Sequence, residues 1–257
     1  MRVDYDKIAH LYDHTPHRGK EVDAYLLAFL AERGQTAVPP RILDLGCGTG
    51  SQLTANQGQI GEAQWVGLDL SAGMLQQAQQ KSASIHWLQG NNAHLPFAHE
   101  SFAYISNQFS FHHVQDKVGM VAEVYRVLAA NGRFVMQNIA PREMPGWVYY
   151  HYFPAAYPLD LNHYLPLADL QALLAAAGFV NIQLKRSRFH YEQDLAQFWA
   201  LAQDRVAASQ LIAIADEAYA AGLARLQADI AAGAATFSSE ICLITLCADK
   251  PGGLDAD

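Results

Sequence analysis

Short apolar runs alternate with helical patterns between residues 41 and 139 of this 257-residue chain, and this alternation restricts the fold more than any other feature. Each run is five to seven residues long and rich in Ile, Val, Leu or aromatic residues, as expected of parallel strands buried on both faces. Repeated strand–helix–strand units imply right-handed crossovers and a doubly wound α/β sheet. The strands are expected at Arg41–Leu45, Gln64–Asp69, Ser84–Leu88, Phe102–Asn107 and Arg133–Ile139.

Helical patterns connect these runs. Ser71 is suited to cap a helix over Ala72–Ala83, and Asn131-Gly132 is expected to close a helix over Asp116–Leu128. Residues 141–166 are loop-like and crowded with aromatic residues and prolines. Further helices are expected at residues 19–33, at Leu167–Ala177 and, as an Ala-rich pair, at Asp194–Ala232, with two last strands at Val180–Tyr191 and Ser238–Ala248.

Three glycines at alternate positions, Gly46, Gly48 and Gly50, follow the first expected strand and precede a helix. Glycine permits a tight turn and a close approach of the backbone to a ligand. The helix N-terminus behind the glycines suits a carboxylate or phosphate group. The spacing differs from the Gly-x-Gly-x-x-Gly of most dinucleotide sites. Asp44, at the end of the strand, would face the bound molecule.

Asp69 lies at the tip of the second expected strand, nineteen residues after Gly50. A carboxylate at this place can accept both hydroxyls of an adenosine ribose. The alternative is an ordinary acid at a helix start, where Asp and Glu are favoured.

The composition restricts the partners. The chain carries 17 Lys and Arg against 25 Asp and Glu, a net charge of −8, which weighs against binding to nucleic acid. Three cysteines without metal-ligand spacing fit a reducing compartment and predict no metal site. The segment Met1–Lys7 has acids where a signal peptide needs apolar residues, and no apolar run is long enough to span a membrane. We therefore expect a cytoplasmic protein.

Four segments together resemble the class I S-adenosylmethionine-dependent methyltransferases, of the broad group that includes the ubiquinone/menaquinone-biosynthesis methyltransferases. They are Tyr5-Asp6-Lys7-Ile8-Ala9 with Tyr12-Asp13, the glycine loop with Asp69, Gly90–Phe97 followed by Ser101-Phe102, and Glu123-x-x-Arg126-Val127-Leu128 leading to Gly132-Arg133-Phe134. The resemblance implies a Rossmann-like, doubly wound, seven-stranded, mostly parallel sheet with the last strand antiparallel, helices on both faces and a helical cap or insertion. It also implies S-adenosylmethionine as cofactor and S-adenosylhomocysteine as product.

The resemblance further implies roles for individual residues. Asp69 would bind the ribose, Asn91 and Asn92 would meet the adenine edge, and Tyr12 would lie over the cofactor in an N-terminal lid. This chain has Asn91-Asn92 where the family usually has Asp-Ala, so the adenine contact lacks a charge. The implied cofactor-binding residues are Tyr12, Arg18, Asp44, Gly46, Cys47, Gly48, Gly50, Asp69, Leu70, Met74, Asn91, Asn92, Ala93, Asn107, Gln108 and Phe109.

We expect one methyltransferase domain over residues 1–250 and a tail over 251–257. Its parts are an N-terminal lid and helix (1–35), a cofactor-binding core (36–140), substrate-cap insertions (141–178 and 191–236) and a C-terminal strand pair (179–190 and 237–249).

The expected reaction is an in-line displacement of the sulfonium methyl group by a substrate nucleophile, in which positioning carries most of the rate. A general base is useful only where the nucleophile holds a proton. His112 and His113, after the fourth strand, are the candidate catalytic residues, and packing is the alternative role for both.

Aromatic residues after the fifth strand are the main clue to the substrate. Apolar pockets with a few polar groups bind small organic molecules, whereas a small satellite core under a loop is the alternative. Residues 194–232 either complete such a cap or form the face of a homodimer. The candidate substrate-lining residues are Trp147, Tyr150, Phe153, Tyr164 and Trp199.

Three classes of function remain. A methyltransferase acting on a small molecule comes first. A nucleic-acid or protein methyltransferase predicts a basic stripe or a recognition domain, and neither is evident. A cofactor-binding protein without methyl transfer is the third. A nicotinamide or flavin oxidoreductase predicts a longer glycine spacing, which this chain lacks.

Overall fold

The computed structural model describes residues 5–14, 20–34 and 36–252, which fall into two units. Of the described residues, the sheet unit contains those within Tyr5–Asn138, Ala168–Lys185 and 245–252. The helical unit contains Ile139–Leu167 and Arg186–Ile244. Three strands have residues in both units, because the boundaries between the units fall after Asn138, Lys185 and Ile244.

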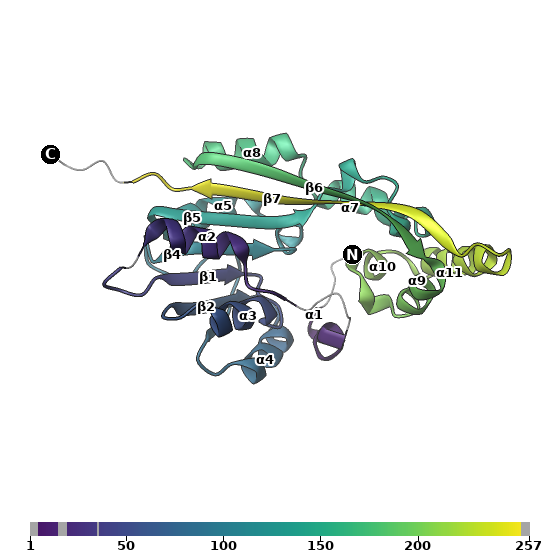
Figure 1. Cartoon of the computed structure of the whole chain (residues 1–257), viewed down its shortest axis with the longest axis horizontal. Coiled ribbons are helices and arrows are strands. Elements are labelled where there is room, and N and C mark those ends of the chain that lie inside the picture. Colours follow the sequence, from purple (N-terminus) through teal and green to yellow (C-terminus); the bar gives the residue numbers. More distant parts are fainter. Residues whose placement is uncertain (1–4, 15–19, 35, 253–257) are drawn as a thin grey trace. The chain divides into compact units, whose positions relative to one another are not determined.

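A seven-stranded sheet has the strand order β3-β2-β1-β4-β5-β7-β6 (Figure 1). The pairs from β3 through β5 are parallel, and one strand, β7, is antiparallel. The expected fold class is therefore confirmed. The strands are β1 (Arg41–Leu45), β2 (Gln64–Asp69), β3 (His86–Gln89), β4 (Phe102–Gln108), β5 (Leu128–Ile139), β6 (Val180–Asp194) and β7 (Thr236–Asp249).

The strand order reverses between β1 and β4, because the chain first winds outward to β3 and then returns to the other side of β1. Right-handed crossovers that leave in opposite directions place their helices on opposite faces of the sheet. The helices of this unit are α1 (Tyr5–Ile8), α2 (Ala24–Arg33), α3 (Ser51–Gln59), α4 (Ala72–Lys81), α5 (Lys117–Val127) and α8 (Leu167–Ala176), with 3-10 turns η1 (Ala9–His14) and η3 (Phe111–His113).

The core of the sheet unit joins α2 and α3 to the strands. Leu26 and Phe29 of α2 are buried against Ile42 and Tyr104. Buried polar groups need partners, and Asp23 supplies one: it caps α2 and accepts a 2.9 Å hydrogen bond from the Tyr104 hydroxyl. This pairing fixes the position of α2 on β4.

The structure confirms the expected strands and the Ser71 cap, whose hydroxyl accepts from the Met74 N–H. The expected helix over Asp116–Leu128 is confirmed as α5 to within one residue at each end, but Asn131-Gly132 does not close it and lies in β5 instead. The helix ends at Val127, because the chain is extended from Leu128 and pairs with Phe102 of β4. The Lys250 ammonium group donates to the Tyr125 and Leu128 carbonyl groups and so satisfies the helix end.

The helical unit differs from expectation in two ways. Residues 141–166 form short helices rather than a loop, because their aromatic side chains are buried. The expected pair of helices at 194–232 is broken near Asp204 and Ala208, where the backbone becomes extended. The elements are η4 (Pro141–Glu143), α6 (Val148–Tyr152), α7 (Ala156–His163), α9 (Leu195–Ala202), η5 (Arg205–Ala207), α10 (Ser209–Ala213) and α11 (Asp216–Ala231).

Among all the residues that the structure describes, no helix combines the length and apolar character needed to cross a membrane.

Gly222, in the middle of α11, tests the packing of the helical unit. A Cβ atom at this position would lie 2.2 Å from Cδ1 of Phe153 and 2.8 Å from the Tyr152 carbonyl oxygen. Phe153 is fully buried, so its ring has no free space to enter. We predict that Gly222→Ala lowers the free energy of unfolding by about 1–3 kcal/mol, the usual cost of overpacking, in urea titrations followed by circular dichroism.

Gly58→Ala in α3 is the matched control. A Cβ atom there would meet no atom of the described residues within 4 Å. Alanine loses less chain entropy than glycine in a helix, so this variant should be more stable than the wild type by up to about 1 kcal/mol. A Gly222→Ala variant as stable as Gly58→Ala would contradict the packing of α11 on Phe153.

Candidate functional site

The loops at the carboxyl ends of β1, β2, β3 and β4 meet at one edge of the sheet unit. In open α/β sheets, ligands bind at this edge where the strand order reverses, which here lies between β1 and β4. The loops are Gly46–Gly50, Asp69–Leu70, Gly90–Ala93 and Phe109–Ser110, and η3 continues the last of them. The predicted residues of these four loops are thus brought together at this edge.

The glycine loop has the backbone that only glycine adopts readily. Gly46, Gly48 and Gly50 have φ values of 69°, 55° and 75°. A Cβ atom at Gly46 would lie 2.2 Å from Oγ of Ser110, and one at Gly50 would lie 2.4 Å from the Trp87 ring. At Gly48 a Cβ atom would meet nothing within 4 Å among the described residues. Bare backbone therefore faces open space at Gly48.

Asp69 joins the glycine loop to α4. Its carboxylate accepts 2.8 Å hydrogen bonds from the N–H groups of Gly48 and Ser71. Burial raises the pKa of Asp69, and these backbone N–H groups oppose that rise. The Leu70 N–H group acts in the same direction. A carboxylate has about four lone-pair positions, more than these donors occupy, so Asp69 can accept a further hydrogen bond where the ribose hydroxyls are expected.

Asp44 is the most perturbed acid at this edge. It is 3% exposed, and burial raises its pKa to about 7. The Ser106 hydroxyl, which donates to it at 2.8 Å, and the charge of Lys20 both oppose the rise. Burial likewise raises the pKa of the Cys47 thiol, with the charges of Asp69 and Asp44 adding to the effect. Asp44 therefore changes charge near neutral pH, and Cys47 stays a thiol.

The end of β4 carries Asn107, Gln108 and Phe109. The Asn107 amide group donates to the Leu45 carbonyl oxygen at 2.7 Å and to Oγ of Ser110 at 2.5 Å. Within residues 5–14, 20–34 and 36–252, no donor reaches its buried Oδ1. Open backbone at Gly48 and spare oxygen acceptors on Asp69 and Asn107 fit a polar nucleoside ligand.

Lys20 covers part of this strand end. Its ammonium group donates to Oε1 of Gln108 at 3.0 Å and lies 5.4 Å from the centre of the Phe109 ring. Phe109 has a φ of 53° and is 40% exposed. A bulky residue seldom adopts this backbone, and such strain is typical of binding edges.

The predicted cofactor-binding residues that follow β2 and β3 differ in exposure. Leu70 is 50% exposed, whereas Met74 is 2% exposed on the buried face of α4. Asn91 is exposed, Asn92 is half-buried and Ala93 is buried. Leu70 and Asn91 thus offer free surface, while Met74 packs inside the unit.

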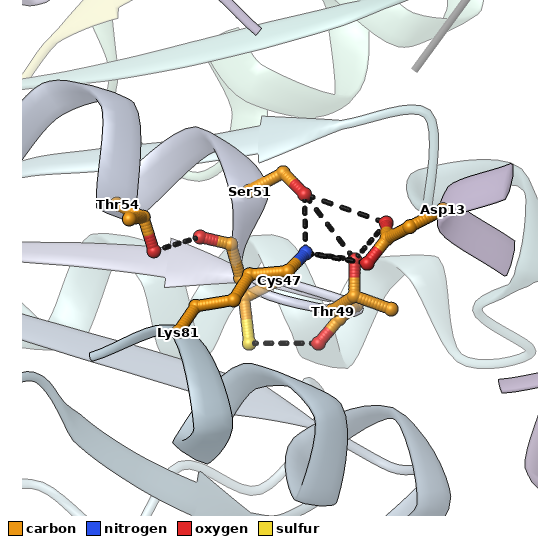
Figure 2. Close-up of polar contacts among 8 residues, drawn as sticks. Asp13, Cys47, Thr49, Ser51, Thr54 and Lys81 are labelled. Carbon is orange, nitrogen blue, oxygen red and sulfur yellow. Dashed lines mark hydrogen bonds and ion pairs between the residues drawn. The ribbon is translucent and has the colours of Figure 1, made fainter. Parts of the chain in front are cut away.

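The N-terminal segment is held against this edge by two aspartates that were not among the predicted site residues. Asp6 accepts 2.7 Å hydrogen bonds from the Ser71 hydroxyl and the Gly73 N–H. Asp13 accepts from the Thr49 hydroxyl at 2.7 Å and lies 2.6 Å from the Lys81 ammonium group (Figure 2). Lys81 also donates to the Thr49 and Ser51 hydroxyls. The segment α1–η1 is therefore tied to both the glycine loop and α4.

Tyr12, the predicted lid residue, is half-buried and makes an edge contact with Tyr5, with ring centres 6.2 Å apart. Arg18 lies outside the described residues. The sequence contained a signal for Asp6 and Asp13, because both belong to the first motif. The spacing of residues within that motif does not indicate which partners Asp6 and Asp13 bind.

The histidine pair lies in η3, directly after β4. Nε2 of His113 is 2.7 Å from the Tyr5 hydroxyl, and the two histidine rings lie 3.8 Å apart. His112 is buried, with Nδ1 3.3 Å from the Asn138 amide nitrogen. His113 is the more accessible of the two.

The helical unit contains the predicted substrate-lining residues. Trp147, Tyr150 and Tyr164 are 5–8% exposed, Trp199 is half-buried, and Phe153 is fully buried. The Tyr150 hydroxyl donates to Asp160 at 2.7 Å, and Gln210 donates to the same oxygen at 2.8 Å. Burial raises the pKa of Asp160. Sequence reasoning missed this acid, because nothing in its local pattern distinguishes it.

Comparisons with known proteins agree with this geometry. A family described as "Methyltransferase domain" matches residues 42–132. Demethylmenaquinone methyltransferase of Lactiplantibacillus plantarum is 31% identical over 176 residues, which cover 58% of this chain and 73% of that protein.

Two solved structures show the same fold. One is described as a methyltransferase from an antibiotic biosynthesis pathway of Anabaena variabilis, with a TM-score of 0.68 at 20% identity, covering 86% of this chain and 94% of that chain. The other is phosphoethanolamine N-methyltransferase 2 of Haemonchus contortus in complex with S-adenosyl-L-methionine, with a TM-score of 0.61 at 18% identity, covering 96% and 57%. The chain therefore belongs to the class I S-adenosylmethionine-dependent methyltransferases, in the group that includes the quinone-biosynthesis enzymes, and its cofactor is S-adenosylmethionine.

Proposed function

We propose that this methyltransferase acts on a small organic metabolite and binds its cofactor at the carboxyl edge of β1, β2 and β4. The observation that carries the binding site is the Asp69 carboxylate, which is bonded to Gly48 and Ser71 and retains acceptor positions. A net charge of −8 argues against a nucleic-acid substrate. The matched relatives are named for demethylmenaquinone, an organic molecule.

The residues at this edge suit the parts of the cofactor. Asp69 would accept from the ribose hydroxyls, and Leu70 would pack on the adenine face. The open backbone at Gly48 leaves room for the methionine part, and Asp44 would supply a negative charge for its ammonium group. Asn91 and Asn92 would meet the adenine edge.

When bound, S-adenosylmethionine supplies a methyl group on a sulfonium centre, which the substrate nucleophile displaces in line. The chain contributes by holding both partners, and correct orientation alone accounts for effective molarities of about 10⁵–10⁸ M in the best cases. His113 would take the proton where the nucleophile carries one. Its bond to the Tyr5 hydroxyl fixes the orientation of the imidazole ring.

We further propose that the aromatic residues Trp147, Tyr150, Tyr164 and Trp199 contribute to substrate binding. They combine apolar faces with a small number of polar groups, which is the usual lining of a metabolite site. The Tyr150 hydroxyl is oriented by Asp160, so its position is defined. Full burial of Phe153 favours a packing role for that residue.

Removal of the Asp69 carboxylate should weaken the ribose contact. We predict that Asp69→Ala lowers the affinity for S-adenosylhomocysteine at least tenfold in calorimetric titrations, because each hydrogen bond to a charged group contributes about 1.5–3 kcal/mol. The 2′-deoxy analogue separates this contact from a disturbed loop: it should bind more weakly than the parent to the wild type but equally well to Asp69→Ala.

Asp194→Ala, which removes a helix cap in the helical unit, is the control variant and should leave the affinity unchanged. If the 2′-deoxy analogue loses as much affinity in Asp69→Ala as in the wild type, Asp69 does not bind the ribose.

Asp44 should make cofactor binding depend on pH. Its pKa of about 7 means that it is protonated at lower pH and then lacks the charge that a cofactor ammonium group needs. The bound ammonium group favours the ionised form, so binding below pH 7 releases a proton. We predict that the affinity for S-adenosylmethionine falls by up to about tenfold per pH unit below pH 7, measured by calorimetry.

Asp44→Asn keeps an oxygen for the Ser106 hydroxyl but has no proton to release. Its affinity should be lower and independent of pH over the same range. An equally steep pH dependence in Asp44→Asn would assign the titration to another group.

His113 should be needed for turnover rather than for cofactor binding. Release of S-adenosylhomocysteine, in a screen of aromatic acceptors that begins with a demethylated naphthoquinol, would provide the assay. With an acceptor that carries a proton, we predict that His113→Gln lowers kcat by about 10²–10⁴-fold and removes the acid limb of the pH profile. Tyr5→Phe, which removes only the bonded hydroxyl, should have a smaller effect. Turnover of His113→Gln equal to the wild type between about pH 6 and 9 would show that His113 is not the base.

A further inference from the structure

The Glu123-x-x-Arg126 motif of α5 has no part in the site described so far. The two side chains form a bidentate ion pair one helical turn apart, with Nε of Arg126 2.6 Å from Oε1 of Glu123 and its terminal nitrogen 2.8 Å from Oε2. A partly exposed ion pair of this kind contributes little to the stability of the fold by itself. Its contacts beyond the helix are what make this pair unusual.

Both side chains bind the backbone of residues 95–97. Oε2 of Glu123 accepts from the Leu95 N–H at 2.7 Å, and Arg126 donates to the Leu95 carbonyl oxygen at 3.0 Å. Arg126 also donates to the Phe97 carbonyl oxygen at 2.8 Å. This segment has no regular secondary structure, and Pro96 has no N–H to donate. The ion pair therefore replaces the backbone partners that the segment lacks.

Leu95 directly follows the turn of residues 91–94, which contains the residues assigned to the adenine edge. The turn closes on itself, because Asn91 accepts from the His94 N–H through its carbonyl oxygen and from the Ala93 N–H through its side chain. At its start, the Gly90 N–H donates to the Asp69 carbonyl oxygen at 2.9 Å. The turn is thus held at one end by the ribose-binding residue and at the other by the ion pair.

We propose that Glu123 and Arg126 are positioning residues for adenine recognition: by fixing Leu95 they hold the Asn91–Ala93 turn at the distance from Asp69 that the cofactor requires. This inference rests on the proposed cofactor site. Both side chains are held in their charged forms: the hydrogen bond from Arg126 and the one from the Leu95 N–H lower the pKa of Glu123. An aliphatic residue at position 126 would leave two carbonyl groups without these donors.

The experiment compares two ligands that differ only at the adenine edge. S-adenosylhomocysteine carries the 6-amino group, and S-inosylhomocysteine has an oxygen in its place. We expect the wild type to prefer the adenine ligand. In Arg126→Ala, this preference should fall by about two- to tenfold, the range that one hydrogen bond contributes. The preference isolates the adenine edge, because a general loss of stability weakens both ligands alike.

Conservative variants separate positioning from folding. Glu123→Gln keeps an oxygen that accepts from Leu95 and should retain most of the preference that Glu123→Ala loses. Arg126→Lys keeps the charge, but one ammonium group does not reproduce the fork that reaches both Leu95 and Phe97, so its preference should be intermediate. The matched control is Arg133→Ala, which removes two ion pairs on β5, one with Asp249 of similar exposure and one with the exposed Glu32, and should leave the preference unchanged.

Each outcome decides the proposal. Reduced preference in Arg126→Ala and Glu123→Ala, with rescue in Glu123→Gln, supports it. An equal loss of affinity for both ligands, or an unchanged preference in folded Arg126→Lys and Arg126→Ala, overturns it. A wild type that binds S-adenosylhomocysteine without preference overturns the inference and leaves the cofactor site intact. A wild type that binds neither ligand overturns both.

Discussion

The rest of the site depends on the contact between the Asp69 carboxylate and the Gly48 N–H. It fixes the tip of β2 to a loop whose three glycines all have positive φ. The same carboxylate accepts from the Ser71 N–H, and the Ser71 hydroxyl caps α4. The strand end, the glycine loop and a helix start thus meet at one acid. Burial raises the pKa of that acid, and the backbone N–H groups of Ser71, Gly48 and Leu70 oppose the rise and so keep the ionised form accessible.

Contacts from the N-terminal segment also hold the residues of this edge in place. Asp6 shares the N-terminus of α4 with Ser71, and the Asp13–Lys81 pair reaches the glycine loop through Thr49. Both ties are charge-assisted and only partly buried, so each is modest in strength and separately breakable. Because one of them binds the loop itself, the order of the segment and the geometry of the loop are coupled. The Tyr5–His113 contact extends this coupling to the histidine pair.

Most of the sheet unit is predictable from the sequence, because its signals are local. Continuous apolar runs locate β1 and β2 to the residue, and the glycine spacing identifies the loop. The partner of the last carbonyl groups of α5 is not predictable in this way, since it is Lys250, more than a hundred residues away. The burial of Met74 and the partners of Asp13 likewise depend on tertiary packing. Asp160 is hidden for the same reason, because Gln210 lies fifty residues further along the chain.

The two units differ in how tightly chemistry constrains their sequences. A cofactor common to the whole family requires the same strand ends and loop, and the family match over residues 42–132 lies wholly within the sheet unit. The family match does not extend into the helical unit. Among the buried polar residues of the helical unit, Tyr150 and Gln210 both donate to one oxygen of Asp160. A buried acid is costly unless hydrogen-bonded, so these two donors make Asp160 compatible with an aromatic core. In return, Asp160 fixes the orientation of the Tyr150 hydroxyl.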